Sequence, residues 1–187
     1  GSGLARARAA TVMLLTLRNT PFLYYGEEIG MEDVAIPADR LRDPARFRTE
    51  GRDPERTPMQ WDDSPGRGFS NWEPWLPYGR PDRNVAVQEK DADSLLSLTK
   101  RAIWLRKRTA VLREGNYREV DSPNGIYAFE RSTPGETASV VINTSAEAKD
   151  VPLSRAGTIV LSTDLRQEGT ACAGVVRVEA FGAVVVL

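Results

Sequence analysis

The fold is decided by the stretch Pro21-Phe22-Leu23-Tyr24-Tyr25-Gly26-Glu27-Glu28-Ile29-Gly30-Met31. From Phe22 to Tyr25 every residue is apolar or aromatic, without the alternation of a strand that has one solvated face. Such a run is typical of a strand in a parallel sheet that helices cover on both sides. Gly26 ends the run and two carboxylates follow at once, where α/β architectures place their chemistry. The stretch predicts a strand over Pro21–Gly26, one β/α unit of a larger barrel, with its active-site loop behind it.

Two helices are predicted around this strand. Leu4–Arg18 is rich in Ala, Leu and Met, which are good helix formers, and it ends before a proline. Ser94–Leu112 carries leucines at helical spacing, and Gly115 is its expected end. Asp91 or Asp93 is the predicted N-cap of this second helix.

The segment between Glu32 and Arg83 has no sustained periodicity and is punctuated by prolines. A loop of this length inside a compact domain is often functional. Its large apolar side chains, Trp61 among them, would be costly to leave in water, so we expect the loop to be ordered. We interpret Trp72-Glu73-Pro74-Trp75 as loop packing in preference to a ligand platform.

Short alternating runs separated by turn residues follow Gly115 and predict an antiparallel β-sandwich. The whole chain is therefore expected to be an α+β protein. Its predicted domains are residues 1–112, the end of a barrel, and residues 113–187, the β-sandwich. The expected strands are Asn116–Val120, Ile126–Arg131, Ala138–Asn143, Lys149–Val151, Thr158–Ser162, Val175–Ala180 and Ala183–Leu187.

Composition excludes several kinds of chemistry. The 187 residues include no histidine and one cysteine, Cys172, which removes Ser-His-Asp hydrolysis, Cys-His proteolysis, His-ligated zinc and a disulfide framework. Chemistry that uses carboxylates alone remains possible. The net charge of −1 gives no argument for a nucleic-acid or membrane partner.

The apolar run Leu4–Leu17 is too short to span a membrane, and Arg6 and Arg8 interrupt it. It also lacks the order of residues expected of a secretory signal. These observations predict a cytoplasmic protein.

Two clusters could carry chemistry. Glu27 and Glu28 could form a pair of catalytic carboxylates, but neighbours on an extended chain point to opposite sides, so we favour one inward and one outward carboxylate that support the loop. Arg52, Asp53 and Arg56 offer planar polar groups beside an aromatic ring, as expected of a carbohydrate cleft. On composition alone, we favour the interpretation of the second cluster as a charged surface loop pinned by Trp61.

Four segments together resemble glycoside hydrolase family 13, most closely its α-glucosidase and oligo-1,6-glucosidase branch. Thr20–Met31 is similar to the eighth barrel strand and the turn after it. Gly51-Arg52-Asp53, Arg56-Thr57-Pro58-Met59-Gln60-Trp61-Asp62 and Gly68-Phe69-Ser70 are similar to the loop that follows. Asn84–Gln88 with Asp93–Arg108 matches the last barrel segment, and the region after Gly115 is similar to the C-terminal β-domain.

The resemblance implies a (β/α)8 barrel enzyme that cleaves α-glucosidic bonds with retention. In the family the catalytic carboxylates lie on the fourth, fifth and seventh strands, upstream of these motifs, so no catalytic residue is assigned here. By resemblance, Arg52 contacts the glucose at the cleaved bond, and Asp53 and Arg56 shape the adjoining subsite. We expect no cofactor, assign no metal-binding residue in this chain, and expect a small α-glucoside or oligosaccharide as substrate of the full-length parent.

A parallel strand needs neighbours on both edges, and this chain offers Pro21–Gly26 none. The chain could be a fragment of a longer protein. Alternatively, its first part could dock on the β-domain without forming a barrel, or another polypeptide could supply the missing strands. We favour a fragment that is inactive alone. Two alternatives stay open: a trehalose synthase of the same family, whose loop has a very similar Arg-Thr-Pro-Met-Gln-Trp motif, and a non-catalytic carbohydrate-binding or structural β-module.

Overall fold

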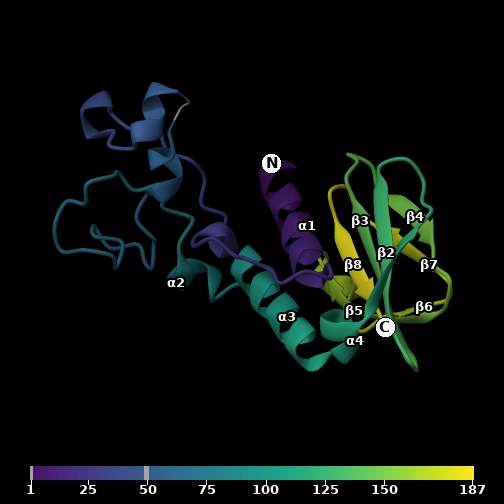
Figure 1. The fold of residues 1–187 in the computed structure, drawn as a ribbon. Helices are drawn as coiled ribbons and strands as arrows, with labels where there is room; N and C mark the ends of the chain where they lie inside the picture. Colours follow the sequence, from purple (N-terminus) through teal and green to yellow (C-terminus); the bar gives the residue numbers. More distant parts are fainter. Residues whose placement is uncertain (1, 49–50) are drawn as a thin grey trace. The chain divides into compact units, whose positions relative to one another are not determined.

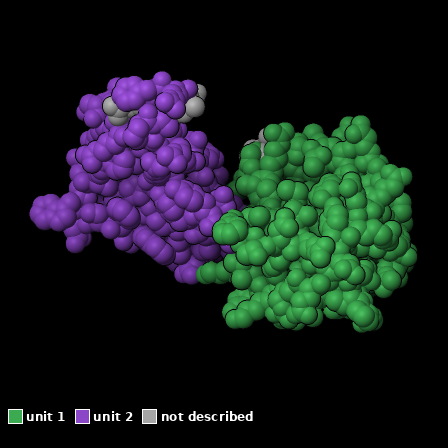
Figure 2. Space-filling view, viewed as in Figure 1, with its two compact units in different colours: residues 1–22, 98–187 green, residues 23–97 purple. Residues whose placement is uncertain are grey.

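The computed structural model describes residues 2–48 and 51–187 (Figure 1). The chain divides into two compact units (Figure 2). Residues 1–22 and 98–187 form one, here named the β unit, and residues 23–97 form the other, here named the loop unit. Each unit has its own buried cluster of apolar side chains. Helix α3 (Leu95–Arg108) begins in the loop unit and ends in the β unit.

The β unit is built on a six-stranded antiparallel sheet. Its strand order is β1-β2-β3-β8-β5-β6, so the last strand of the chain lies in the interior of the sheet, between β3 and β5. The hairpin between β2 and β3 turns through Pro134-Gly135, where Gly135 has φ 95°, a conformation that favours glycine. The strands are β1 Asn116–Val120, β2 Ile126–Thr133, β3 Glu136–Asn143, β5 Gly157–Ser162, β6 Ala171–Cys172 and β8 Ala183–Val186.

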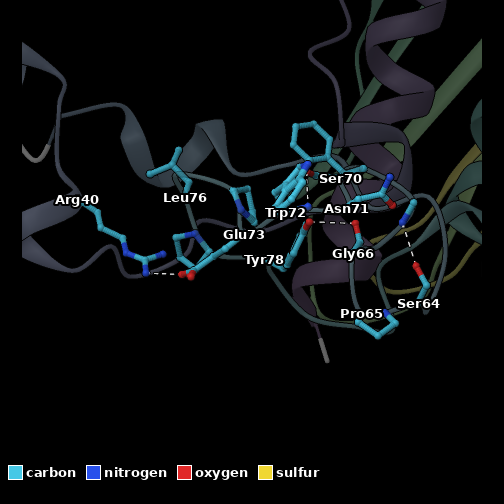
Figure 3. Close-up of a pocket in the computed structure, with 14 residues that line it drawn as sticks. Arg40, Ser64, Pro65, Gly66, Ser70, Asn71, Trp72, Glu73, Leu76 and Tyr78 are labelled. Carbon is cyan, nitrogen blue, oxygen red and sulfur yellow. Dashed lines mark hydrogen bonds and ion pairs between the residues drawn. The ribbon is translucent and has the colours of Figure 1, made fainter.

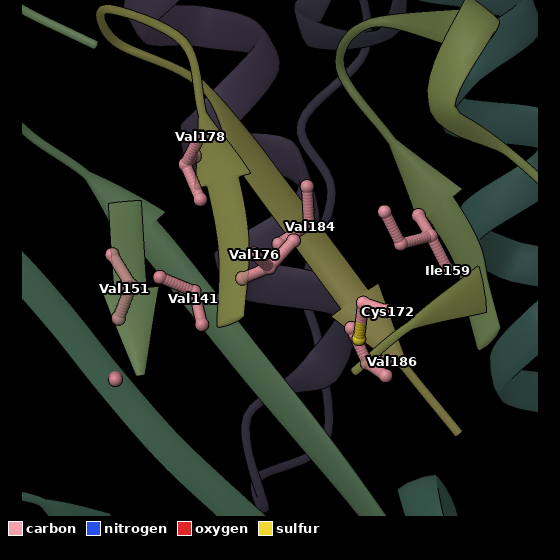
Figure 4. Close-up of a cluster of buried hydrophobic side chains, with 9 residues drawn as sticks. Val141, Val151, Ile159, Cys172, Val176, Val178, Val184 and Val186 are labelled. Carbon is pink, nitrogen blue, oxygen red and sulfur yellow. The ribbon is translucent and has the colours of Figure 1, made fainter. Parts of the chain in front are cut away.

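Both faces of this sheet are covered. A second antiparallel pair, β4 (Lys149–Pro152) and β7 (Val175–Val178), packs on one face. Helix α1 (Ser2–Thr16) contacts β3 and β8, and α4 (Ala110–Glu114) contacts β2 and β3. The cluster beneath the β4–β7 pair is shown in Figure 4 and consists of Ala128, Val141, Val151, Ile159, Cys172, Val176, Val178, Val184 and Val186.

Arg131 is the buried charge on the helix-covered face of the sheet. Side chains alternate along a strand, so Arg131 of β2 points away from Ala128 and the β4–β7 pair. Its side chain is fully buried, and its guanidinium donates to the backbone carbonyls of Thr16 (2.8 Å), Leu112 (2.9 Å) and Gly115 (2.9 and 3.2 Å). These carbonyls end α1 and α4, where a positive charge is favourable.

Arg106, on α3, supports the same end of α1. It donates to the carbonyls of Leu15 (2.8 Å), Leu17 (2.9 Å) and Asn19 (2.8 Å). Burial lowers the pKa of both Arg106 and Arg131. Two arginines from distant parts of the chain therefore pair the carbonyls that a helix leaves without partners at its end.

Seven strands predicted after Gly115 are confirmed, with ends that differ by no more than two residues; the two-residue strand β6 was not predicted. The second helix is confirmed over α3, but it breaks at Thr109 and resumes as α4. Its predicted N-cap is wrong. Ser94, whose Oγ accepts from the N–H of Ser97 at 3.1 Å, caps the helix in place of Asp91 or Asp93.

The predicted strand Pro21–Gly26 does not form. These residues pair with no strand in the part of the chain that the structure describes, and the Phe22 side chain is 84% exposed. Leu23, Tyr24 and Tyr25 are also exposed. A parallel strand takes its hydrogen bonds from neighbours that connect through long crossovers, and the six-stranded sheet is antiparallel and offers it none.

The long loop is ordered, as predicted, and short helical turns make up part of the loop unit. Residues 49–50 of this loop lie outside the described residues. Its core holds Ile29, Met59 and Leu96. Gln60 is fully buried and donates to the carbonyls of Arg80 and Arg83, both at 2.9 Å. The turns are η1 Glu27–Ile29, η2 Ala38–Arg40, η3 Pro44–Phe47 and η4 Asp53–Arg56, and they precede helix α2 Val85–Gln88.

Among the residues that the structure describes, no helix combines the length and the apolar character needed to cross a bilayer. The domain boundary proposed between residues 112 and 113 stays a prediction. The two compact units reflect packing within this chain, with both chain ends in the β unit, and do not test how a longer protein would be divided.

We expect Arg131→Met to lower the free energy of unfolding by at least ~3 kcal/mol, because three buried carbonyl groups would lose their donor. Urea unfolding followed by far-UV circular dichroism would measure the change. Arg177→Met is the matched control: this arginine is exposed on β7 and pairs with Asp150 at 3.3 Å, so we expect a loss below ~1 kcal/mol. Equal losses in the two variants would contradict the role given to Arg131.

Candidate functional site

The turn after Tyr25 uses both of its carboxylates to hold the backbone. The Glu27 carboxylate accepts from the N–H of Tyr24 at 3.2 Å, and the Glu28 carboxylate accepts from the N–H of Gly26 at 2.7 Å. Glu27 is exposed and Glu28 is half-buried. The interpretation of Glu27 and Glu28 as carboxylates that support the loop is confirmed, but the extended backbone assumed for them is wrong, because both residues lie in the 3-10 turn η1.

Gly26 makes this turn possible. Its φ is 90°, and a Cβ at this position would lie 2.7 Å from the sulfur of Met31. Its carbonyl accepts from the N–H groups of Ile29 and Met31. A side chain would therefore meet both backbone strain and a clash, which explains the glycine between the aromatic run and the two glutamates.

Two buried aspartates form the centre of the long loop. Asp43, 2% exposed, accepts from the N–H of Ala45 (2.8 Å), from the N–H of Arg52 (3.1 Å) and from Nε of Arg52 (2.9 Å). A Nη of Arg56 lies 3.3 Å from the same carboxylate. The hydrogen bond from the Ala45 N–H and that from the Arg52 guanidinium lower the pKa of Asp43 from 3.8 to about 2.

Asp53 is buried as deeply, with 1% of its side chain exposed. One of its oxygens accepts from the N–H groups of Arg42 (2.7 Å) and Asp43 (2.8 Å), and the other lies 3.7 Å from a Nη of Arg56. Asp53 therefore ties η4 to the segment before η3. Because Asp53 is enclosed, its carboxylate could accept a hydrogen bond from a sugar hydroxyl only if the loop moved. Its predicted part in shaping a subsite would act through the position of its neighbours.

Arg52 presents the most accessible charge of the three predicted site residues. Its Nε is held by Asp43, while 62% of the side chain stays exposed. Arg56 is about one third exposed and bridges the two aspartates. The structure thus brings Arg52, Asp53 and Arg56 together around Asp43. Asp43 orients the Arg52 guanidinium through Nε, and most of the side chain remains exposed to solvent. This arrangement suits a planar donor for ligand oxygens.

A small hollow of about 320 Å³ lies beside this cluster, within the loop unit. Arg56 and Tyr25 contribute its polar groups, and Tyr25 donates its hydroxyl to the carbonyl of Thr57 at 3.0 Å. Burial, and next to it the neighbouring Tyr24, raise the pKa of Tyr25, so its hydroxyl is a neutral donor at neutral pH. The rest of the lining is apolar: Pro58, Met59, Phe69, Pro74, Trp75 and Leu76.

A larger hollow of about 880 Å³ shares Phe69, Pro74 and Leu76 with the first. Figure 3 shows the residues around it, with the ion pair between Arg40 and Glu73 and the hydrogen bond from Tyr78 to the carbonyl of Gly66 (2.9 Å). Both hollows lie within residues 23–97. They are therefore neighbouring hollows that share one wall.

The two tryptophans of the segment Trp72–Trp75 behave differently. Trp75 packs as predicted: its indole N–H donates to the carbonyl of Arg40 at 2.6 Å, and the Arg42 guanidinium lies 4.7 Å from the centre of its ring. Trp72 is 84% exposed at the larger hollow. The interpretation of the segment as loop packing is therefore right for Trp75 and wrong for Trp72.

Four aromatic side chains after Gly115 pack within the β unit. Phe129 is fully buried between Tyr117 and Tyr127, whose hydroxyls lie 2.7 Å apart. Phe181 lies under the Arg6 guanidinium, 4.5 Å from the ring centre. These four side chains therefore do not form an exposed platform for a sugar.

Sequence reasoning missed Asp43, although a signal was present. Asp43 precedes a proline, and Asp at the N-cap with Pro at the first helical position is a helix-start signature. What the sequence could not show is that the same carboxylate is reached by Arg52 and Arg56, nine and thirteen positions later. In residues 2–48 and 51–187, no group of three or more His, Cys, Asp or Glu side chains is placed to hold a metal ion.

Residues 2–115 match the family model for the alpha amylase catalytic domain, which is more than half of the chain. The chain belongs to this family, glycoside hydrolase family 13. Within it, the homologues include α-glucosidases and oligo-1,6-glucosidases. A probable alpha-glucosidase of Rhizobium meliloti is 35% identical over 81% of this chain and 29% of its own length. An oligo-1,6-glucosidase of Halalkalibacterium halodurans is 32% identical over 73% of this chain and 29% of its own length.

The fold is also similar to solved structures. The trehalulose synthase MutB from Pseudomonas mesoacidophila MX-45 matches 97% of this chain with a TM-score of 0.85 and 28% identity, over 38% of the MutB chain. MutB variants have been crystallised in complex with glucose and with sucrose. This chain spans about three tenths of the length of the curated relatives named above.

We expect acid to destabilise the loop unit through Asp43. Its pKa is about 2 in the folded chain against 3.8 ordinarily, so its stabilisation is complete above about pH 4 and is lost as the pH falls through 2. Asp43→Asn should lower the melting temperature at pH 7 and flatten its fall between pH 4 and pH 2. Thermal unfolding followed by tryptophan fluorescence would measure both.

Asp63→Asn is the control for this experiment, because Asp63 is exposed in the same loop. We expect it to leave the melting temperature at pH 7 and the acid limb nearly unchanged. An acid limb equally steep in the Asp43 variant and the original chain would refute the role of this carboxylate.

Proposed function

We propose that this chain is the C-terminal part of a retaining α-glucosidase-like enzyme that cleaves α-glucosidic bonds in short glucosides. The helix α1, the run Phe22–Tyr25 and helix α3 would belong to the end of a (β/α)8 barrel. The strands after Gly115 would form its C-terminal β-sandwich domain. Membership of glycoside hydrolase family 13 supports the proposal, as do the relatives named as α-glucosidases.

The observation that carries the proposal is the geometry of Arg52. Asp43 holds Nε of Arg52 at 2.9 Å, and the rest of the side chain remains open. A guanidinium fixed in this way loses little conformational entropy when it binds a ligand oxygen. Arg52 would contact the glucose at the cleaved bond. Arg56 would border the adjoining subsite, in the hollow it shares with Tyr25.

The exposed run Phe22–Tyr25 fits the same proposal. Contiguous exposed apolar side chains mark a surface that another part of a protein covers. In the proposed parent, neighbouring barrel strands would cover this run and would bring the reacting carboxylates near Arg52. We propose a cytoplasmic location for the parent, an expectation from the sequence alone.

A synthase reaction is the second candidate, because solved structures with a similar fold include a trehalulose synthase. The alternative of a trehalose synthase also remains. The products that a longer enzyme containing this chain forms from maltose and from sucrose separate these candidates. Monosaccharides alone indicate hydrolysis, whereas a rearranged disaccharide, trehalose from maltose or trehalulose from sucrose, indicates a synthase.

In such a longer enzyme, we expect Arg52→Ala to lower kcat/KM on p-nitrophenyl α-glucoside by about 100-fold, since it removes charged hydrogen bonds of roughly 1.5–3 kcal/mol at the reacting sugar. The control is Arg80→Ala, whose side chain pairs with Asp82 at 2.8 Å on the surface of the same loop unit. We expect that variant to keep kcat/KM within about twofold. An unchanged kcat/KM in Arg52→Ala would rule out the proposed contact.

The 187-residue chain alone should not turn over p-nitrophenyl α-glucoside. A retaining glycosidase needs two carboxyl groups about 5 Å apart, and the two hollows contribute one, Glu73, which is paired with Arg40. Release of p-nitrophenol by the purified chain would be compared with buffer and with a Glu73→Gln variant. Turnover above buffer by the original chain would contradict the proposal.

A further inference from the structure

Trp72 stands out because the rest of the fold does not use its side chain. Its backbone N–H donates to Oγ of Ser70 at 3.0 Å, which fixes the main chain, while 84% of the residue remains exposed. Neighbouring Trp75 forms a hydrogen bond and a cation–π contact. An exposed tryptophan on a fixed backbone presents a flat apolar face at little conformational cost, which is a feature of binding sites.

The hollow beside Trp72 has the composition of a site for a neutral, hydroxyl-rich ligand. Its volume of about 880 Å³ falls in the range of small-molecule sites, ~300–1,000 Å³. Phe69, half exposed, adds a second aromatic surface. Uncharged polar groups that can donate and accept hydrogen bonds complete it: Ser64, Ser70, Asn71 and Tyr78.

The charges around the hollow cancel. Arg40 and Glu73 form an ion pair with each other, and both line the hollow (Figure 3). A site for phosphate or for a carboxylate would offer an arginine whose charge is not matched by a carboxylate. The paired charges can still donate to and accept from hydroxyl groups, which favours a sugar over an anion.

The position of the hollow relates it to the cluster around Arg56. Its wall of Phe69, Pro74 and Leu76 also lines the smaller hollow that contains Arg56 and Tyr25. A chain of linked sugars that enters one hollow therefore reaches the border of the other. We propose that Trp72 and its hollow form a second subsite, which binds an α-linked glucose oligosaccharide away from the glucose that Arg52 would contact.

The assignment of α-linked glucose rests on the proposed function, whereas the preference for a neutral sugar rests on the lining alone. The test is a titration of the 187-residue chain with maltotriose, measured by isothermal titration calorimetry, whose signal does not depend on any one tryptophan. We expect saturable binding. It should be lost or weakened about tenfold in affinity in Trp72→Ala, which removes the stacking face from an exposed position where folding does not depend on it.

Two control variants isolate the effect. Trp104 is 59% exposed on α3, outside the loop unit, so Trp104→Ala should keep the affinity for maltotriose. Arg80→Ala, on the surface of the same unit and outside both hollows, should also keep it within about twofold. Loss of kcat/KM in Arg52→Ala together with unchanged maltotriose binding in Trp72→Ala would reject the subsite and leave the proposed function intact.

A third sugar tests the linkage. Cellotriose, which is β-linked, should bind at least about fivefold more weakly than maltotriose. Equal binding of the two would overturn the assignment to α-linked glucose. An absence of saturable binding in the original chain, or an equal affinity in Trp72→Ala, would overturn the subsite itself.

Discussion

The β unit depends on one buried guanidinium. Arg131 sits on β2 and donates to the carbonyls of Thr16, Leu112 and Gly115, which end α1 and α4. A charge without a carboxylate partner is costly to bury, and here four hydrogen bonds and the negative ends of two helices offset that cost. The contacts bind the first helix of the chain to a sheet formed more than a hundred residues later. Helix α1 also packs on β3 and β8.

In the loop unit a buried carboxylate organises the backbone around it, as the Arg131 guanidinium does in the β unit. Asp43 is a buried carboxylate that accepts from a backbone N–H and from Arg52, and it lies close to Arg56. It gives a segment with little regular structure a fixed centre, and Asp53 and Gln60 add further buried polar contacts. The outcome matters for the proposed function, because Arg52 is oriented on one side and exposed on the other. Asp43, which a sugar would not contact, therefore positions Arg52, which a sugar would contact.

The aromatic run Phe22–Tyr25 shows that an apolar pattern does not by itself produce a strand. Residues apolar at successive positions do mark strands buried on both faces, and β3 and β8 of this chain show it: Val140, Val141, Val184 and Val185 are almost fully buried. The same pattern at Phe22–Tyr25 is left exposed. Whether a strand is buried depends on the strands that pair with its edges and the segments that cover its faces. The sequence of the strand alone does not specify these neighbours.

The sequence by itself determined seven of the strands after Gly115, the positions of helices α1 and α3, the family, and the grouping of Arg52, Asp53 and Arg56, because periodicity, turn residues and local motifs act over a few positions. Only the tertiary structure decided that Arg131 joins helices to sheet, that Asp43 orients Arg52, that Asp53 is enclosed, and that Trp72 is open while Trp75 packs. Two tryptophans three residues apart have the same local propensity. Their burial is set by contacts such as the one between Trp75 and Arg40, thirty-five positions away in the chain.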